Sequence, residues 1–311
     1  MLPEIIHYYH WTGFEDKRYP GVAREFIDNG CRRFTFTDGL LNEILLKRPE
    51  KKEFLRDLCR NLNIEFVSAH GLCGLYYDLD IPDPEERKTM IRDHIRAMEL
   101  AKEFGSQTYT VHVGAYYYCH KRMPVEVLRQ NALDALKQLV PEAERIGIII
   151  AVENSFEKPN SAKEVLGLVT LFDGNPAIGV CYDAGHANCM RSVPGKKHED
   201  YPEYFRVSWW DKGVEFEDGA LELLKPHIVT CHLHDNNGLS DLHALPGDGT
   251  VCWDELLAKL QECPRMLDYQ SEVNCVGGTN WAGLSPAPAG GYSIRRLTET
   301  FRKMGFQDSV K

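Results

Sequence analysis

AIGVCYDAGH, residues 177–186, is an apolar run that ends in Asp183 and His186. Three other stretches have the same form: IGIIIAVENS (146–155), HIVTCHLHD (227–235) and MLDYQSEVN (266–274). Buried strands of a parallel sheet are nearly continuous apolar runs, and they rarely bury a carboxylate that is neither paired nor bound to a metal. We therefore interpret the four stretches as buried strands that carry acidic and histidine side chains to one edge of a sheet.

Strand-like runs alternate with helix-like segments along the whole chain. Segments such as 85–105 and 125–147 have apolar residues at helical spacing, and both end in a glycine, which often follows a helix. Eight strand-and-helix units predict an α/β fold, the (β/α)8 TIM barrel, whose active site lies at the C-terminal ends of the strands. The predicted strands are residues 4–10, 31–37, 64–70, 108–114, 146–154, 178–183, 228–234 and 266–273.

A doubly wound open sheet is the alternative arrangement of such units. It requires a phosphate-binding glycine motif after the first strand, and the first turn, HWTGFEDKRYPG (10–21), has none. No Pro/Gly/Ser-rich linker divides the sequence, so we predict a single domain over residues 1–311 with long loops on the C-terminal face. Aromatic clusters in these loops, at 116–118 and 209–210, either pack the loops down or form the wall of a ligand pocket.

The composition predicts a cytoplasmic protein. Ten cysteines are scattered without a CxxC pair, which is typical of a reducing compartment. The sequence begins without a signal peptide and has no apolar stretch of 18 or more residues, so we expect no membrane partner. The formal net charge of -10 argues against a nucleic-acid partner, because such proteins usually present a basic face.

Residue types that bind metals gather at the predicted strand ends. Glu153, Asp183, His232 and Glu272 come from four different strands, and imidazole and carboxylate together suit Zn, Mn, Co or Fe. Taken singly, an ion pair explains Glu153 and a helix cap explains Asp183 equally well. Further side chains of the same kind lie near the ends of other strands or in the loops that follow them: His70, His112, His186, His234, Asp241 and His243.

Four segments resemble the sugar isomerases and epimerases of the xylose isomerase-like TIM barrel superfamily, which also includes endonuclease IV. They are AVENSFE (151–157), CYDAGHAN (181–188), CHLHDNNGLSDLHALPGDGTVCWDE (231–255) and SEVN (271–274). The resemblance implies one divalent metal, Mn, Co, Zn or Mg, held by Glu153, Asp183, His232 and Glu272. His234 is the alternative ligand, but family members place the ligand histidine three residues before the acid that is Asp235 here.

The resemblance implies a metal-dependent sugar isomerase or epimerase that works through an enediolate. Glu153 and Glu272 would be the acid and base on a keto-sugar, and His186 would bind a substrate hydroxyl. Glu157 either reaches the same hydroxyls or forms a salt bridge in its loop. Gly238 stands where some ketose 3-epimerases have an arginine. A small sugar, free or phosphorylated, is the expected substrate, and a homo-oligomer is the expected assembly.

Three alternatives stay open from the sequence. The same enolisation serves elimination reactions, such as sugar dehydration or cleavage of a C-glycoside. An endonuclease IV-like phosphodiesterase would use up to three zinc ions. A sugar- or metal-binding protein without catalysis is the third. The residues that match the ligands of the three-zinc cluster of endonuclease IV are His70, His112, Glu153, Asp183, His186, His232, Asp241, His243 and Glu272.

Overall fold

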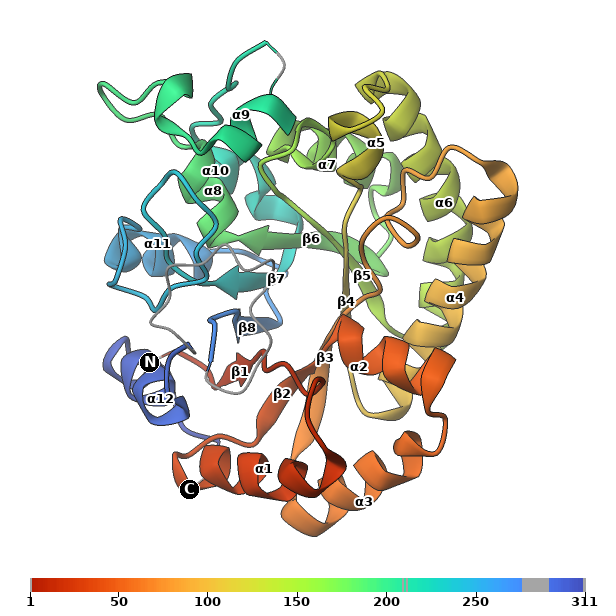
Figure 1. Cartoon of the computed structure of the whole chain (residues 1–311), viewed down its shortest axis with the longest axis vertical. Helices are drawn as coiled ribbons and strands as arrows, with labels where there is room; N and C mark the ends of the chain where they lie inside the picture. Colours follow the sequence, from red (N-terminus) through yellow and green to blue (C-terminus); the bar gives the residue numbers. More distant parts are fainter. Residues whose placement is uncertain (1, 209, 211, 276–290, 310–311) are drawn as a thin grey trace.

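The barrel predicted from the sequence is confirmed. A computed structural model describes residues 2–208, 210, 212–275 and 291–309, and in it parallel strands close into a barrel in chain order (Figure 1). The strands are β1 (Ile5–His7), β2 (Arg33–Phe36), β3 (Glu65–His70), β4 (Thr108–Val111), β5 (Ile149–Glu153), β6 (Ile178–Asp183), β7 (Ile228–Leu233) and β8 (Asp268–Ser271).

Each predicted strand overlaps an observed one, but several are shorter than the apolar runs that predicted them. β1 ends at His7 because the residues after it pack into the core. The ring of Tyr9 lies 5.5 Å from that of Phe26, and the ring of Trp11 lies 5.1 Å from that of Phe34. An apolar run therefore marks burial here more reliably than it marks the end of a strand.

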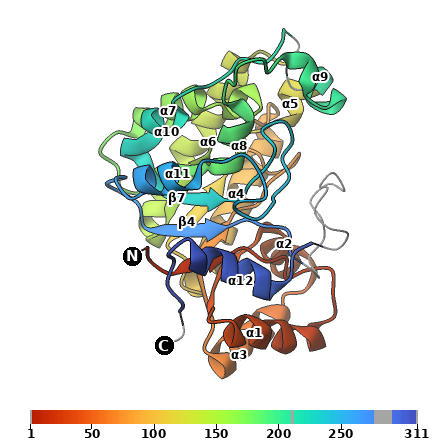
Figure 2. The ribbon, with the colours of Figure 1, turned by 90° about the vertical axis from the view of Figure 1, so that its left-hand side faces the viewer.

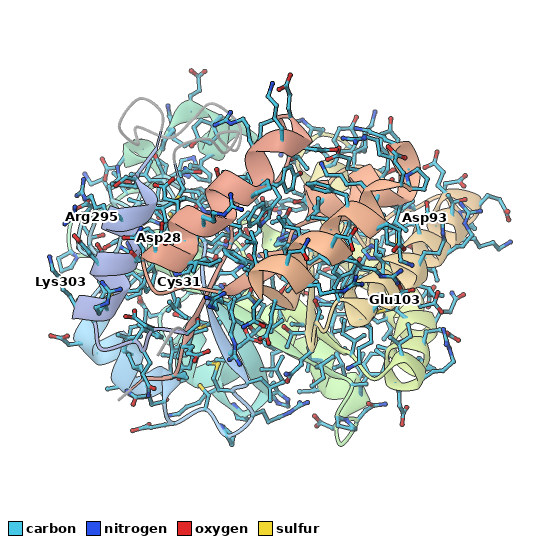
Figure 3. All side chains as sticks on the ribbon, turned by 90° about the horizontal axis from the view of Figure 1, so that it is seen from below. Asp28, Cys31, Asp93, Glu103, Arg295 and Lys303 are labelled. Atoms are coloured by element: carbon cyan, nitrogen blue, oxygen red, sulfur yellow. The ribbon has the colours of Figure 1, made fainter. Side chains whose placement is uncertain are left out.

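Helices surround the barrel and cover its outer face (Figures 1 and 2). Seen from below, α12, α1, α3 and α4 lie side by side, with Cys31 beyond the end of α1 (Figure 3). The α-helices are α1 (Tyr19–Asp28), α2 (Asp38–Asn42), α3 (Lys51–Leu62), α4 (Pro84–Glu103), α5 (Tyr116–Cys119), α6 (Val125–Ile146), α7 (Ala162–Val169), α8 (Ala184–Met190), α9 (Glu203–Ser208), α10 (Ala220–Leu224), α11 (Trp253–Leu260) and α12 (Ile294–Lys303).

Local sequence explains where the two long helices begin and end. The side chain of Asp83 accepts hydrogen bonds from the backbone N–H groups of Glu85 and Glu86, which caps the start of α4. Gly147 follows α6 with a φ of 76°, a left-handed conformation that glycine adopts without strain. These caps confirm the helices that were expected from the apolar spacing of residues 85–105 and 125–147.

The main hydrophobic core lies between the barrel and its helices, whereas the inside of the barrel is polar. Gln270 Nε2 donates hydrogen bonds to Ser68 Oγ and Thr230 Oγ1 at 2.7 Å, and Gln270 Oε1 accepts one from Thr35 Oγ1 at 2.8 Å. Barrel interiors are more often filled by branched apolar side chains. This polar packing continues upward to the C-terminal ends of the strands.

A second, smaller hydrophobic cluster lies on the C-terminal face of the barrel. It joins the loop after β5 to the segment around α9, and its buried members are Phe156, Met190, Tyr201, Phe205 and Trp210. Because this cluster is separate from the main core, the loops that it holds together form a distinct layer over the strand ends. In the part of the chain that the structure describes, no helix has the length and apolar character needed to cross a bilayer.

Candidate active site

The ends of β5 to β8 bring four of the predicted ligands together. Glu153 and Asp183 are the last residues of β5 and β6. His232 lies in β7, and Glu272 directly follows β8. One donor atom from each residue lies within 4.8 Å of the others. His232 Nδ1 is the common point, because it lies 3.2 Å from Glu272 Oε2, 3.4 Å from Glu153 Oε2 and 3.8 Å from Asp183 Oδ2.

This geometry fits a divalent cation. Two ligand atoms that are each about 2.1 Å from one ion lie roughly 3.0 to 4.2 Å apart, depending on the angle at the ion, and the three distances to His232 Nδ1 fall within that range. His232 is fully buried, yet neither of its ring nitrogens has a hydrogen-bond partner of acceptable geometry. A cation among the three carboxylates would satisfy Nδ1, and this donor set suits Mn, Co, Zn or Fe.

His234 belongs to neighbouring groups of potential ligands. Its Nε2 lies 3.0 Å from Asp183 Oδ2, so it holds one carboxylate of the four-residue group from outside. Its other close neighbours include Asp241 and His243. The short approach explains the glycine of DAGH, because a Cβ on Gly185 would lie 2.0 Å from His234 Cε1. His232 thus lies among the three carboxylates of the four-residue group, whereas His234 contacts one of them from outside.

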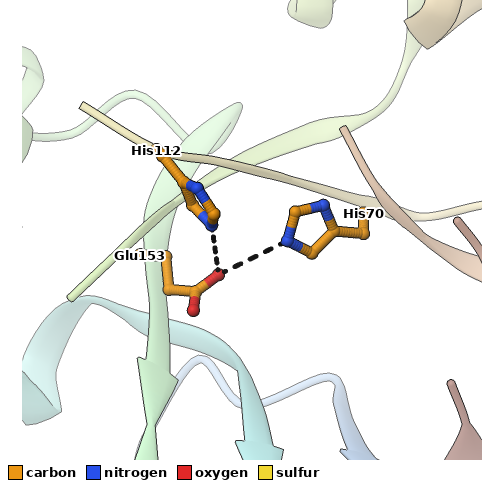
Figure 4. Close-up of side chains that lie close together, drawn as sticks. All are labelled: His70, His112 and Glu153. Atoms are coloured by element: carbon orange, nitrogen blue, oxygen red, sulfur yellow. Dashed lines mark hydrogen bonds and ion pairs between the residues drawn. The ribbon is translucent and has the colours of Figure 1, made fainter. Parts of the chain in front are cut away.

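His70 and His112 form a second group with Glu153. Figure 4 shows both imidazoles pointing at the same carboxylate oxygen. His112 Nε2 lies 3.2 Å and His70 Nε2 lies 3.8 Å from Glu153 Oε2. Glu153 is therefore shared between this group and the four-residue group. Neither histidine is an isolated loop residue.

The loop after β7 brings a third group to the site. His243 Nε2 lies 3.0 Å from Asp241 Oδ2, and His186 Nε2 lies 3.5 Å from the same oxygen. His243 Nδ1 is 2.7 Å from the backbone oxygen of Glu272, which ties this loop to β8. The φ of His243 is 45°, a left-handed backbone that is uncommon for residues other than glycine. The site therefore holds His243 in a conformation that its own backbone does not prefer.

Asp235 organises the loop that presents Asp241 and His243, a role that was not predicted. Its Oδ1 accepts the N–H groups of Asn236 at 2.9 Å and Val251 at 3.1 Å. Its Oδ2 accepts the N–H of Gly247 at 2.9 Å and the indole N–H of Trp253 at 2.8 Å. The segment HLHD…PGDGT…W thus forms a loop in which three backbone N–H groups and the tryptophan indole donate hydrogen bonds to one buried carboxylate. An acid directly after a buried strand, followed by glycines and a tryptophan, was the available signal.

The buried charges of the site compensate one another. Burial alone would raise the pKa of Glu153, but the nearby His232 and His112 hold that pKa well below its usual range. Burial alone would lower the pKa of His243, but Asp241 raises it to about 10. Glu153 is therefore ionised, and His243 attracts a proton. A bound cation would compete with protons at such groups, since ligand atoms must be deprotonated to bind a metal.

A cavity of about 320 Å³ opens above these groups. Phe156, Tyr204 and Phe205 form an apolar wall, and no Lys or Arg side chain lines it within the described part of the chain. Glu157 also lines the cavity and accepts a hydrogen bond from Asn160 Nδ2 at 3.1 Å, and burial raises its pKa. Among the residues that the structure describes, Glu157 forms no salt bridge.

The described aromatic residues of the clusters expected at 116–118 and 209–210 do not line this cavity. Trp210 packs behind Phe156 and donates its indole N–H to the Phe156 backbone oxygen at 3.0 Å. Tyr118 lines a neighbouring cleft. The prediction for Trp209 falls outside the residues that the structure describes.

Solved structures share this fold. The structure of a D-tagatose 3-epimerase-like protein is 21% identical, covers 87% of both chains and has a TM-score of 0.60. A putative xylose isomerase from Rhodospirillum rubrum is 16% identical, with 97% of this chain and 99% of that chain covered and a TM-score of 0.69. A xylose isomerase-like TIM barrel protein from Mycobacterium smegmatis in complex with magnesium is 14% identical, with 97% and 95% covered and a TM-score of 0.65. At these identities the likeness concerns the fold alone.

Sequence comparison points to the same family. An uncharacterized protein of Methanocaldococcus jannaschii is 28% identical over 223 residues, which are 69% of this chain and 66% of the length of that protein. The family model described as "Xylose isomerase-like TIM barrel" matches residues 24–265, well over half of the chain. The chain therefore belongs to the xylose isomerase-like TIM barrel family.

Proposed function

We propose that the protein is a divalent-metal-dependent sugar isomerase or epimerase. The observation that carries this proposal is the position of Glu153 and Glu272, whose Oε2 atoms lie 3.4 and 3.2 Å from His232 Nδ1. Two carboxylates thus face one candidate metal position from different strands, at the floor of a cavity with an aromatic wall. Membership of the family and the fold shared with a D-tagatose 3-epimerase-like protein support a sugar as the substrate.

The side chains of the site have distinct roles in this reaction. A divalent cation, when bound, polarises a carbonyl and a neighbouring hydroxyl of the sugar. One of the two glutamates removes the proton from the carbon that bears this hydroxyl, next to the carbonyl, and the other returns a proton to the opposite face, which inverts that carbon. Return to the adjacent carbon gives isomerisation instead. General acid–base catalysis of this kind contributes roughly 10²- to 10⁴-fold in rate.

His186 and Glu157 bind and orient the sugar. His186 Nδ1 lies 3.0 Å from the backbone oxygen of Asn154, which fixes the ring beside the two catalytic groups. Glu157 lines the cavity and presents its carboxyl group to the substrate hydroxyls. Elimination, as in sugar dehydration or C-glycoside cleavage, starts with the same proton removal and differs only in the group that leaves. A cytoplasmic location and a homo-oligomeric state stay predictions.

An endonuclease IV-like phosphodiesterase is the second candidate. Its support is the set of overlapping groups of potential metal ligands, which could hold up to three zinc ions. A phosphodiester backbone is normally neutralised by Lys and Arg. The formal net charge is -10, and the cavity residues that the structure describes include neither Lys nor Arg. Sugar chemistry is therefore the better account.

Exchange of substrate C–H protons with solvent deuterium tests the proposal. Ketoses and keto-sugars are incubated with the protein and Mn, Co, Mg or Zn in D2O, and NMR follows loss of the C–H signal. We expect exchange with at least one sugar, and its loss in Glu153→Gln and Glu272→Gln. Exchange that persists in both variants would contradict the catalytic roles. About one tightly bound ion per chain supports this proposal, and about three with phosphodiester cleavage support the second candidate.

A further inference from the structure

The cavity and its surroundings differ sharply in charge. The described side chains that line the cavity include histidines and five carboxyl groups but no Lys or Arg, so an anionic group inside it would meet several carboxyl groups and no Lys or Arg to neutralise it. The carboxyl groups that line it are Asp78, Glu153, Glu157, Asp241 and Glu272. The part of the substrate that reacts there is therefore best uncharged.

A second cleft of about 460 Å³ adjoins the cavity, and Phe156 lines both. Loops after β4, β5 and β6 form it, near α5, α7 and α9 in the upper part of the molecule (Figures 1 and 2). Four cationic side chains line this cleft: Arg122, Lys158, Lys163 and Lys212. Phe156 thus lines both spaces, but among the described residues Lys and Arg side chains line only the cleft.

Two of these cations have no anionic partner within the residues that the structure describes. Lys163 and Lys212 are exposed, and their side chains make neither an ion pair nor a hydrogen bond there. Lys158 pairs with Glu215. The other acids of the cleft are already engaged, because Glu164 accepts two hydrogen bonds from Arg129, and Glu217 accepts the backbone N–H groups of Ala162 and Lys163. The cleft therefore has cationic charge to offer a ligand.

The floor of the cleft is apolar. Phe156, Met190 and Trp210 belong to the small hydrophobic cluster over the strand ends, and Phe216 packs against it. The hydrogen bond from the Trp210 indole to the Phe156 backbone fixes the wall between cleft and cavity. A ring or sugar face can pack on such a floor while an anionic group reaches the lysines at the rim. The cleft therefore suits a ligand that has both a face that packs on apolar side chains and an anionic group.

We propose that the cleft is a second subsite, which binds the anionic part of a two-part substrate while an uncharged sugar unit occupies the cavity. The ligand class is a glycoside or similar conjugate that carries a carboxylate or phosphate. This inference rests on the proposed sugar chemistry of the cavity. It adds that the protein selects substrates with an anionic group outside the reacting sugar unit. Lys163 and Lys212 are the residues that give this specificity.

Matched probes test the subsite. Titration calorimetry on the full chain compares 4-carboxyphenyl glucoside with 4-carbamoylphenyl glucoside, two probes that carry the same neutral sugar and differ in the charge of the aromatic group. We expect the carboxyphenyl glucoside to bind about tenfold more tightly and to lose this advantage in 0.5 M salt, because screening weakens exposed ion pairs. Equal affinities for the two probes would overturn the proposal.

Variants assign the effect to the cleft. The double variant Lys163→Gln/Lys212→Gln should bind both probes equally. Lys137→Gln, an exposed lysine on α6 about 12 residues from its start and so roughly 18 Å from the cleft, should keep the preference. A preference that survives the double variant overturns the subsite. Deuterium exchange on small neutral sugars should be unchanged in the double variant, so failure of the subsite and failure of the sugar chemistry give different results.

Discussion

His232 is the residue on which the candidate metal centre depends most. It is the one imidazole whose nitrogen lies within 3.8 Å of oxygens from Glu153, Asp183 and Glu272 together. We predict that His232→Asn abolishes stoichiometric metal binding at micromolar metal. His234→Asn should weaken affinity only about 10- to 100-fold, as loss of a partner of a ligand does. Calorimetric titration with Mn or Zn measures both. The opposite order would make His234 the ligand.

Asp80 predicts a pH dependence of stability. It is 1% exposed, neither carboxyl oxygen has a hydrogen-bond partner of acceptable geometry, and burial together with Asp78 raises its pKa to about 8. Because the pKa in the folded state is above that in the unfolded state, the stabilisation is fully present below about pH 4 and is lost as pH rises through about 8.

Asp80→Asn should remove this loss. We expect the variant to gain stability over the parent between pH 5 and pH 9, by an amount on the order of several kcal/mol. Urea unfolding at each pH measures the gain. Parallel pH profiles for the two proteins would show that Asp80 titrates normally. The space beside Asp80 is also restricted, because a Cβ on Gly114 would lie 2.2 Å from Asp80 Cγ.

Residue-level prediction from sequence succeeded where strand geometry decides position. Glu153, Asp183 and His232 could be placed at one site because parallel strands of a barrel all end on the same face. The environment of Asp80 could not be predicted, because it includes Gly114, 34 positions later in the sequence. The role of Asp235 was missed although its partners are local: the most distant, the indole of Trp253, is 18 positions later.

At the scale of elements, the loop between β7 and α11 is a unit closed by Asp235. Asp235→Ala removes a buried carboxylate that accepts four hydrogen bonds. We predict a loss of about 3 kcal/mol or more in the free energy of unfolding, since hydrogen bonds to charged groups contribute about 1.5–3 kcal/mol each. Hydrogen exchange should rise for the backbone N–H groups of Gly247 and Val251.

The same loop offers a control. Asp248 forms an exposed ion pair with Arg296, with an Nη2–Oδ2 distance of 2.7 Å. Asp248→Ala should cost about 1 kcal/mol or less, because surface ion pairs contribute little. If both variants lose the same stability and show the same exchange, Asp235 does not close the loop. If Asp235→Ala exchanges as slowly as the parent, the loop is held by other contacts.

Element boundaries were predicted less well than element types. The apolar run at 4–10 predicted a long first strand, but β1 is Ile5–His7 because Tyr9 and Trp11 leave the sheet for the core. The helices α4 and α6 were predicted well because residues adjacent to each helix cap it, as Asp83 and Gly147 do. Local signals thus predicted helix ends, and tertiary packing set strand ends.

At the scale of the whole molecule, the C-terminal face joins a group of potential metal ligands, a cavity without described Lys or Arg side chains and a cleft lined by cationic side chains. The cationic side chains of the cleft come from separate segments of the chain: Arg122, Lys158, Lys163 and Lys212. Composition could not show this, because a net charge of -10 conceals a local excess of cations.

Crystals grown with Mn²⁺ and measured near the manganese absorption edge test the central claim most directly. The anomalous difference map should show a strong peak about 2.0–2.4 Å from a carboxylate oxygen of Glu153, of Asp183 and of Glu272 and from His232 Nδ1. If a protein that binds manganese in solution shows its peak away from these four atoms, the proposed metal centre is wrong.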